Sequence, residues 1–234
     1  MSVRIDPQIQ SQLNTTHLET PSGAPQFQPV GEQIQQTLFS RVQPRLLSVH
    51  DFPELAWLLV VLNKYRRKLA QMVGDRDEDY AIVLADDTIA AVDQHGTIFM
   101  GVAFLKGHKD NLDVLVGALA HEIGHRPKRV RQLNVNLSRD LTRPELQALC
   151  LHEEIRADTF AGKALAELGF SCEPLIDFLR LVQVRPHPEY LPAEQRGEVI
   201  RDAHAGRAYR AEARRKLFPE YHRHTSPNGH LGDY

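Results

Sequence analysis

An apolar stretch that runs directly into two histidines and a glutamate is the feature that most constrains the fold. Val114 to Ala120 is apolar throughout, and His121-Glu122-Ile123-Gly124-His125 follows it without a break. Apolar residues recur at helical spacing through this segment, which predicts one helix with Asp110 or Asn111 as its N-cap. A buried imidazole or carboxylate without a partner costs free energy. The fold must therefore bring a partner to the polar end of this helix.

The spacing of the polar residues is typical of a catalytic zinc site. Residues four apart lie on one face of a helix, so His121 and His125 can present two imidazole nitrogens to one ion. Glu122 lies about 100° round the helix and can reach a water bound to that ion. Zinc accepts imidazole and carboxylate ligands and keeps one position for water in catalytic sites. The motif therefore predicts one Zn²⁺ per chain, with Glu122 as the base that activates water.

The zinc ion needs a third protein ligand, and the chain just after His125 does not supply one. Arg126-Pro127 discourages the helix from continuing, and no third histidine follows as it does in metzincins. The strongest other helix is predicted from Thr142, which can form a capping box with Glu145, to Leu168 before Gly169. We expect the third ligand on this second helix.

Two acidic residues lie one turn apart on the second helix. Glu154 is the best candidate for the third ligand, and Asp158 can accept the outer N–H of a ligand histidine. His152 and Glu153 are competing candidates for the ligand role. The sequence thus predicts a site built from two helices that are distant in the chain.

The remaining segments indicate an α+β fold. Three short apolar runs bounded by turn residues predict a meander of three strands over 80–85, 88–92 and 97–102. A further helix is expected from Asp51, which can form a capping box with Glu54, to Gly74. Two more helices are expected over 174–184 and 193–217. The fold class is therefore mostly helical, with a small mixed or antiparallel sheet of about three strands beside the histidine-bearing helix.

One core with two tails is expected for a chain of 234 residues. Residues 1–36 contain eight glutamines and four prolines and follow neither a helical nor a strand period. We assign 1–40 to a disordered or extended N-terminal arm, 41–218 to the domain and 219–234 to a C-terminal tail. The arm could be an inhibitory segment, a secretion address or a linker.

The composition excludes several classes of function. With 28 basic and 30 acidic residues, the chain has no global field that would attract nucleic acid. We interpret the basic cluster of residues 126–131 as a solvated helix face. No apolar run approaches the roughly twenty residues that span a bilayer, and no secretory signal is recognisable. We expect a soluble, cytoplasmic protein that acts on a protein or peptide substrate, and export without a cleaved signal stays open.

Over about residues 50–205 the chain resembles the gluzincin metallopeptidases of the HtpX, CAAX prenyl protease and BepA group. Leu115 to His125 resembles the active-site helix of that family, and Glu154-Ile155-Arg156-Ala157-Asp158 matches its Glu-x-x-Ala-Asp helix. The resemblance implies a zincin-like fold in which His121, His125 and Glu154 bind zinc, Glu122 is the base and Asp158 supports a ligand.

Two further matches extend the resemblance. His187-Pro188 and the later Arg196 are similar to the family's His-Pro loop and following arginine, which implies a catalytic role for His187 and a possible one for Arg196. Residues 88–91 and 96–101 resemble the family's strand pair, whose second member borders the cleft. An extended substrate would then pair with an edge strand formed by Ile98, Phe99, Met100 and Gly101.

The sequence therefore predicts a zinc metalloendopeptidase that hydrolyses peptide bonds through a metal-activated water. One alternative is an ImmA-like regulatory peptidase, since that class also pairs a His-Glu-x-x-His helix with a Glu-x-x-Ala-Asn/Asp helix. Another is a latent zinc-containing binding or chaperone module whose cleft is occluded.

Overall fold

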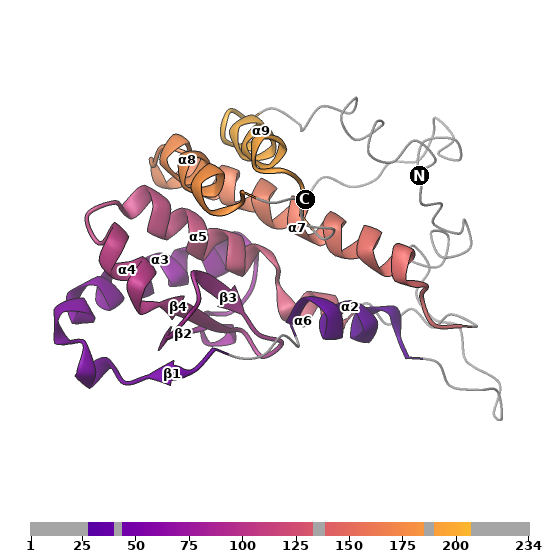
Figure 1. The fold of residues 1–234 in the computed structure, drawn as a ribbon, viewed down its shortest axis with the longest axis horizontal. Coiled ribbons are helices and arrows are strands. Elements are labelled where there is room, and N and C mark those ends of the chain that lie inside the picture. The colour runs from indigo at the N-terminus through magenta and orange to yellow at the C-terminus, as the bar shows by residue number, and fades with distance from the viewer. Residues whose placement is uncertain (1–27, 40–43, 133–138, 185–189, 207–234) are drawn as a thin grey trace.

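The computed structural model describes residues 28–39, 44–132, 139–184 and 190–206. The helices are α2 (Val30–Phe39), α3 (Ala56–Met72), α4 (Val102–His108), α5 (Leu112–Gly124), α6 (Pro127–Arg131), α7 (Arg143–Leu168), α8 (Glu173–Val182) and α9 (Ala193–His204). The strands are β1 (Leu46–Leu47), β2 (Ala81–Ala85), β3 (Ala90–Val92) and β4 (Thr97–Gly101). This mostly helical structure with a small sheet confirms the predicted α+β class (Figure 1).

The sheet is mixed, and its strand order is β1-β2-β4-β3. β2 pairs with β4 in parallel, whereas β3 pairs with β4 and β1 pairs with β2 in antiparallel fashion. The predicted meander is therefore wrong, although its three strands exist. The turn at Asp93 explains the β3–β4 hairpin, because its carboxylate accepts hydrogen bonds from the backbone of His95 and Thr97, and Gly96 adopts a φ of 88°. β2 and β3 are consecutive in the chain but do not pair, and β4 lies between them.

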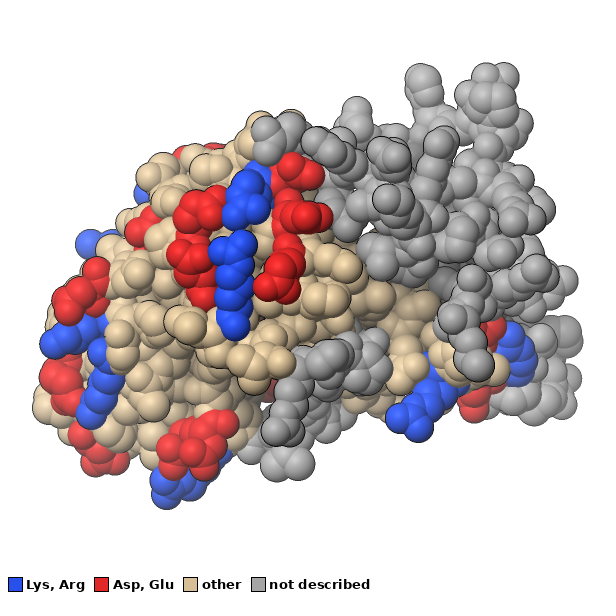
Figure 2. Space-filling model, turned by 45° about the horizontal axis from the view of Figure 1, so that its top comes forward, with Lys and Arg blue, Asp and Glu red and all other residues tan. Residues whose placement is uncertain are grey.

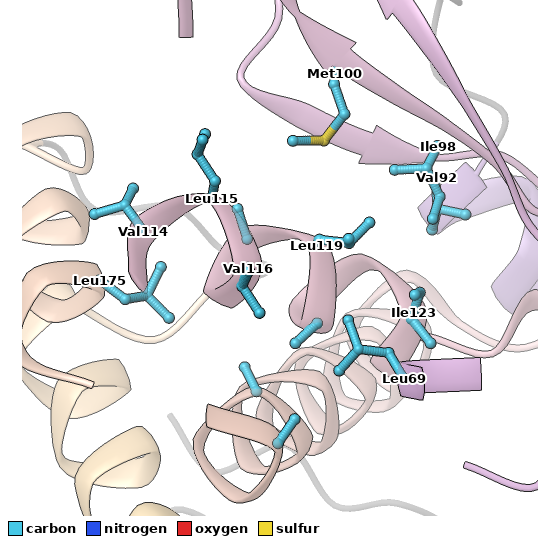
Figure 3. Packing of buried hydrophobic residues seen from close by; sticks show 14 of the residues in the cluster. Leu69, Val92, Ile98, Met100, Val114, Leu115, Val116, Leu119, Ile123 and Leu175 are labelled. Atoms are coloured by element: carbon cyan, nitrogen blue, oxygen red, sulfur yellow. The ribbon is translucent and has the colours of Figure 1, made fainter. Parts of the chain in front are cut away.

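Helix α5 lies between the sheet and the other helices and forms the centre of the core. Its residues Leu115, Leu119 and Ile123 are fully buried. Figure 3 shows them between Met100 and other side chains from the sheet on one side and Leu69 and Leu175 from neighbouring helices on the other. Burial on all sides explains why the sequence of α5 is apolar nearly throughout.

Helix α7 begins and ends where the sequence predicts. Thr142 is its N-cap and forms the predicted capping box with Glu145, and Gly169 closes the helix in the left-handed conformation. α7 contacts both α5 and α9. This long helix therefore carries its acidic residues directly past the histidines of α5.

The predicted start of α3 is wrong. Two short 3₁₀ turns, Val49–Asp51 and Pro53–Leu55, precede the helix, whose N-cap is Leu55 with no side-chain hydrogen bond. Glu54 does not cap the helix but pairs with Lys106 at 2.8 Å. Phe52, at φ −134° and ψ 59°, interrupts the helical path between the two turns.

Helix α2 corrects the predicted extent of the N-terminal arm. Residues 30–39 form a helix, and Val30, Ile34, Leu38 and Phe39 are all buried. The first three lie four apart and make one apolar stripe, which the many glutamines around them obscured. α2 contacts α6 and α7. The rest of the assigned arm up to residue 27, the C-terminal tail and the predicted helical residues 207–217 lie outside the described residues.

Basic and acidic side chains alternate on the described surface. Figure 2 shows a row of basic side chains with acidic ones on both sides, on the face that α8 and α9 form. On these helices Arg201 pairs with Glu173, and Arg180 pairs with Asp177. This face therefore lacks a large field of one sign. Among the described residues, no helix is both long and apolar enough to cross a bilayer.

The charge of Glu145, which pairs with Arg139 beside the capping box of α7, makes a testable contribution to stability. Hydrogen bonds from Arg139 and Thr142 lower the pKa of Glu145 from 4.5 to about 2. A lowered pKa in the folded state stabilises the fold above the unfolded pKa, and the contribution is lost as pH falls from 4.5 toward 2. We expect Glu145→Gln to lower the Tm at pH 7 by roughly 2–4 °C, measured by circular dichroism.

This difference in Tm should narrow as the pH is lowered from 5 toward about 2. Glu167→Gln on the same helix is the matched control, because Glu167 is exposed, and it should leave the Tm unchanged at every pH. A constant difference between Glu145→Gln and the parent across this range would contradict the assignment.

Candidate metal centre

Three residues from two helices converge as the sequence predicts. His121 and His125 come from the last turn and the C-cap of α5, and Glu154 comes from the middle of α7. Glu154 Oε2 lies 3.3 Å from His121 Nε2, and Oε1 lies 3.8 Å from His125 Nε2. Potential ligand atoms of the three side chains all lie within 4.8 Å of one another. This group could hold a metal ion.

The competing ligand candidates lie elsewhere. Glu153 points away from the cluster and receives hydrogen bonds from Arg129 and Arg156. Neither Glu153 nor His152 belongs to the group of potential ligands found among the described residues. The geometry therefore favours Glu154 over both of its neighbours in sequence.

Small residues bring the two helices together at this point. A Cβ atom on Gly124 would lie 2.9 Å from Cα of Ala157, closer than real Cβ contacts allow. Glycine at position 124, inside the histidine motif, is therefore what lets α7 approach α5. Arg156, beside Ala157, ties the same helices together by donating a hydrogen bond to the carbonyl of His125 at 2.8 Å.

The end of α5 is fixed directly after the second histidine. Arg126 adopts the left-handed conformation at φ 47°, and Pro127 then opens α6. The Arg126 guanidinium donates two hydrogen bonds to Asp75, and the hydroxyl of Tyr80 lies 2.7 Å from the same carboxylate. These contacts hold Arg126 in an unfavourable backbone conformation and so set the position of His125.

The predicted basic cluster at 126–131 is largely paired with acids. Besides the Arg126–Asp75 pair, Lys128 pairs with Asp79 and Arg129 pairs with Glu153. The cluster therefore serves the packing of α6, and it offers little free positive charge to an anionic partner.

Asp158 and Arg196 restrain the position of His121. Asp158 Oδ1 lies 2.9 Å from Nδ1 of His121, close in distance but outside hydrogen-bond angles, so the contact is electrostatic. Arg196 from α9 donates to both carboxylate oxygens of Asp158 at 2.8 Å. This bidentate pair fixes Asp158, which in turn restrains the imidazole of His121.

Burial and neighbouring charges shift the pKa values at the site in opposite directions. Burial alone would lower the pKa of His121, but Asp158 and Glu154 raise it to about 10. Burial lowers the pKa of His125 to about 4. Burial raises the pKa of Glu122 to about 7. The neighbouring His121 opposes this shift, because it favours the charged carboxylate. Opposed shifts of this size in one small cluster are typical of functional sites.

A bound metal ion would satisfy the potential ligand atoms better than the hydrogen bonds available to them do. Oε2 of Glu154, which lies 3.3 Å from Nε2 of His121, is buried and has no hydrogen-bond partner among the described residues. Burying such atoms unpaired costs free energy. Two imidazoles and one carboxylate are a donor set that divalent transition metals accept.

A cleft of about 480 Å³ opens onto the three potential ligands and Glu122. β3 forms one wall, and Leu38 and Phe39 of α2 contribute to another. The Phe39 ring meets the ring of His125 edge-on, with 5.8 Å between centroids. No prediction from the sequence included this wall, although the spacing of Val30, Ile34 and Leu38 carried the signal for it.

The predicted substrate-edge strand is wrong. Ile98, Phe99, Met100 and Gly101 belong to β4, which has β2 on one side and β3 on the other, so its backbone groups are already paired. β3 is the edge strand beside the cleft, and the backbone of Val92 hydrogen-bonds to Glu122. Of the four predicted residues, only Phe99 lines the cleft.

Of two residues in or near the predicted His-Pro loop, the structure describes Tyr190 but not His187. His187 lies outside the described residues, so its role stays a prediction. Tyr190 was not singled out from the sequence, yet it lines the cleft and its ring lies 5.5 Å from the guanidinium carbon of Arg196. A lone tyrosine after a proline-rich loop carries no pattern that would have marked it.

No family model matches the chain, and no curated protein matches it at a significant level. The resemblance to gluzincins therefore rests on the motifs of this sequence.

Replacing the α7 carboxylate tests the metal centre. We expect the parent to bind one Zn²⁺. Glu154→Gln should lower the zinc affinity by more than the roughly 10–100-fold that is lost when a residue that hydrogen-bonds to a metal ligand is removed. A neutral amide is a poor replacement for a carboxylate ligand at a buried site. Competition with a chelating dye measures the affinity. Glu167→Gln is again the control, and parental affinity in Glu154→Gln would remove Glu154 from the site.

Proposed function

We propose that the chain is a zinc metalloendopeptidase with a zincin-like fold of the gluzincin type. The observation that carries the proposal is the carboxylate of Glu122 beside a three-residue metal-ligand group in an open cleft. A purely structural metal site needs no base and no access to substrate. His121, His125 and Glu154 would hold the zinc ion.

The chemistry divides between the metal ion and Glu122. When bound, zinc would polarise the scissile carbonyl and lower the pKa of a water. Glu122 takes a proton from the attacking water and delivers it to the nitrogen of the leaving amine. Its environment suits both steps, because burial raises its pKa to about 7 and so favours a carboxyl group that exchanges a proton readily.

The open edge of β3 favours an extended peptide as the substrate. Ile89 and Asp93 use their backbone groups toward β4, through hydrogen bonds with Gly101 and Thr97. Ladder groups alternate in an antiparallel pair, so those of Ala90 and Val92 face the open edge, where the N–H of Val92 already donates to Glu122. An extended peptide can add there as a further strand and lie across His121 and Glu122.

Removing the base tests this function. We expect Glu122→Gln to retain zinc and to lose about 10²- to 10⁴-fold in peptide cleavage, because it can no longer accept a proton. Mass spectrometry of peptides from a denatured protein mixture measures the cleavage, and zinc content is measured in parallel. Asp113→Asn, an equivalent change at the far end of α5, should cleave like the parent. Parental cleavage by Glu122→Gln would eliminate Glu122 as the base.

A further inference from the structure

The outward face of α3 carries basic and apolar side chains and no acidic one. With successive residues about 100° apart, six exposed residues of this helix fall within an arc of about 100°. We name this surface the α3 face, and its members are Trp57, Val60, Lys64, Arg67, Lys68 and Gln71. The fully buried Leu58, Leu62 and Leu69 lie on the opposite side of the helix, which contacts α5. The α3 face therefore points away from the core.

The apolar members of the α3 face are largely exposed. Trp57 is 51% exposed and Val60 is 59% exposed, and the two lie about one helical turn apart. Trp57 is also the only tryptophan in the chain. Covering these two side chains would remove apolar surface from water, so this turn favours a partner with an apolar layer of its own.

The basic members of the α3 face have no acidic partner among the described residues. No ion pair there involves Lys64, Arg67 or Lys68, and the Lys68 ammonium lies only over the ring of Tyr65, 5.9 Å from its centroid. Lys64 and Lys68 are four residues apart on one helix, where like charges repel each other. α3 itself contains no acidic residue that could relieve this repulsion. An anionic partner would relieve it.

The α3 face differs in this respect from the other basic surfaces already described. Arg66, on the side of α3 away from this face, pairs with Asp77 at 2.7 Å. The basic cluster of α6 is largely paired with acids, and so are Arg180 and Arg201 on α8 and α9. The α3 face therefore keeps a local positive charge in a chain whose formal net charge is −2.

A tryptophan and an aliphatic residue beside three cations match the chemistry of an anionic membrane surface. A tryptophan ring favours the interface between acyl chains and water. Each Lys or Arg near anionic headgroups strengthens binding by about fivefold. A nucleic acid fits less well, because its bases stack on aromatic rings and gain little from the aliphatic Val60.

We infer that the α3 face binds the surface of an anionic membrane. Its two apolar side chains enter the interface, and its three cations lie against the lipid headgroups. Binding of this kind is peripheral and reversible, because the inserted area is small. The inference is independent of the metal centre and of the proposed peptidase activity.

The single tryptophan reports directly on this site. The full chain is titrated with vesicles of phosphatidylcholine that contain about 30% phosphatidylglycerol. The emission of Trp57 should move to shorter wavelength, and lipids brominated in their acyl chains should quench it, because the ring leaves water. Both changes should disappear in about 0.5 M NaCl, which screens the charges, and with vesicles of phosphatidylcholine alone.

Charge reversal tests the basic members. The double variant Lys64→Glu, Arg67→Glu should lower the vesicle partition coefficient by at least about tenfold, because two attractions become repulsions. Arg143→Glu, Lys163→Glu makes the same change in net charge at exposed positions of α7 and should bind as the parent does. Circular dichroism checks that both variants fold. Glu122→Gln should also bind as the parent does, which separates this inference from the proposed function.

Vesicle flotation, which needs no fluorophore, tests the apolar members. Trp57→Ala should float with anionic vesicles more weakly than the parent. Unshifted emission with anionic vesicles, equal binding to uncharged ones, or parental flotation by Trp57→Ala or by the Lys64 and Arg67 double variant would overturn the inference. A shift of the emission with single-stranded DNA or with polyglutamate, but not with vesicles, would overturn it as well and would assign the α3 face to a polymeric anion.

Discussion

The close approach of α5 and α7 is the contact on which the rest of the site depends. Gly124 has no side chain, and Ala157 opposite it has a small one, so the two helices meet where the potential ligands lie. Any larger residue at position 124 would push Glu154 away from the two imidazoles. The apolar sequence of α5 supports this contact, because it lets the helix be buried between the sheet and its helical neighbours.

This contact also concentrates charge where water is scarce. Glu122, Glu154 and Asp158 are 8%, 4% and 1% exposed, and Arg196 pairs with the last of them. Arg156, nearby, is engaged with Glu153 and with the carbonyl of His125. Buried carboxylates in excess of their cationic partners are costly. A divalent ion between Glu154 and the imidazoles would relieve that cost, which explains how a stable fold can carry such a cluster.

The sequence predicted the convergence of three potential ligands and the α+β class, because helical spacing and capping are local signals. His121, His125 and Glu154 could be placed on helix faces from short-range patterns, and Gly124 made their approach possible. Strand order was not predictable in the same way, because only long-range pairing decides which of β3 and β4 forms the edge. α2 was missed because glutamines dilute its apolar stripe, and Tyr190 reaches the cleft through tertiary packing that no local pattern encodes.

X-ray absorption at the zinc edge of the zinc-loaded full chain tests the central claim most directly, because it reports the atoms bound to the metal. We expect two imidazole nitrogens at about 2.0–2.1 Å and carboxylate or water oxygens at about 2.0–2.2 Å. A spectrum with fewer than two imidazoles, or with sulfur at about 2.3 Å from Cys150 or Cys172, would contradict the account.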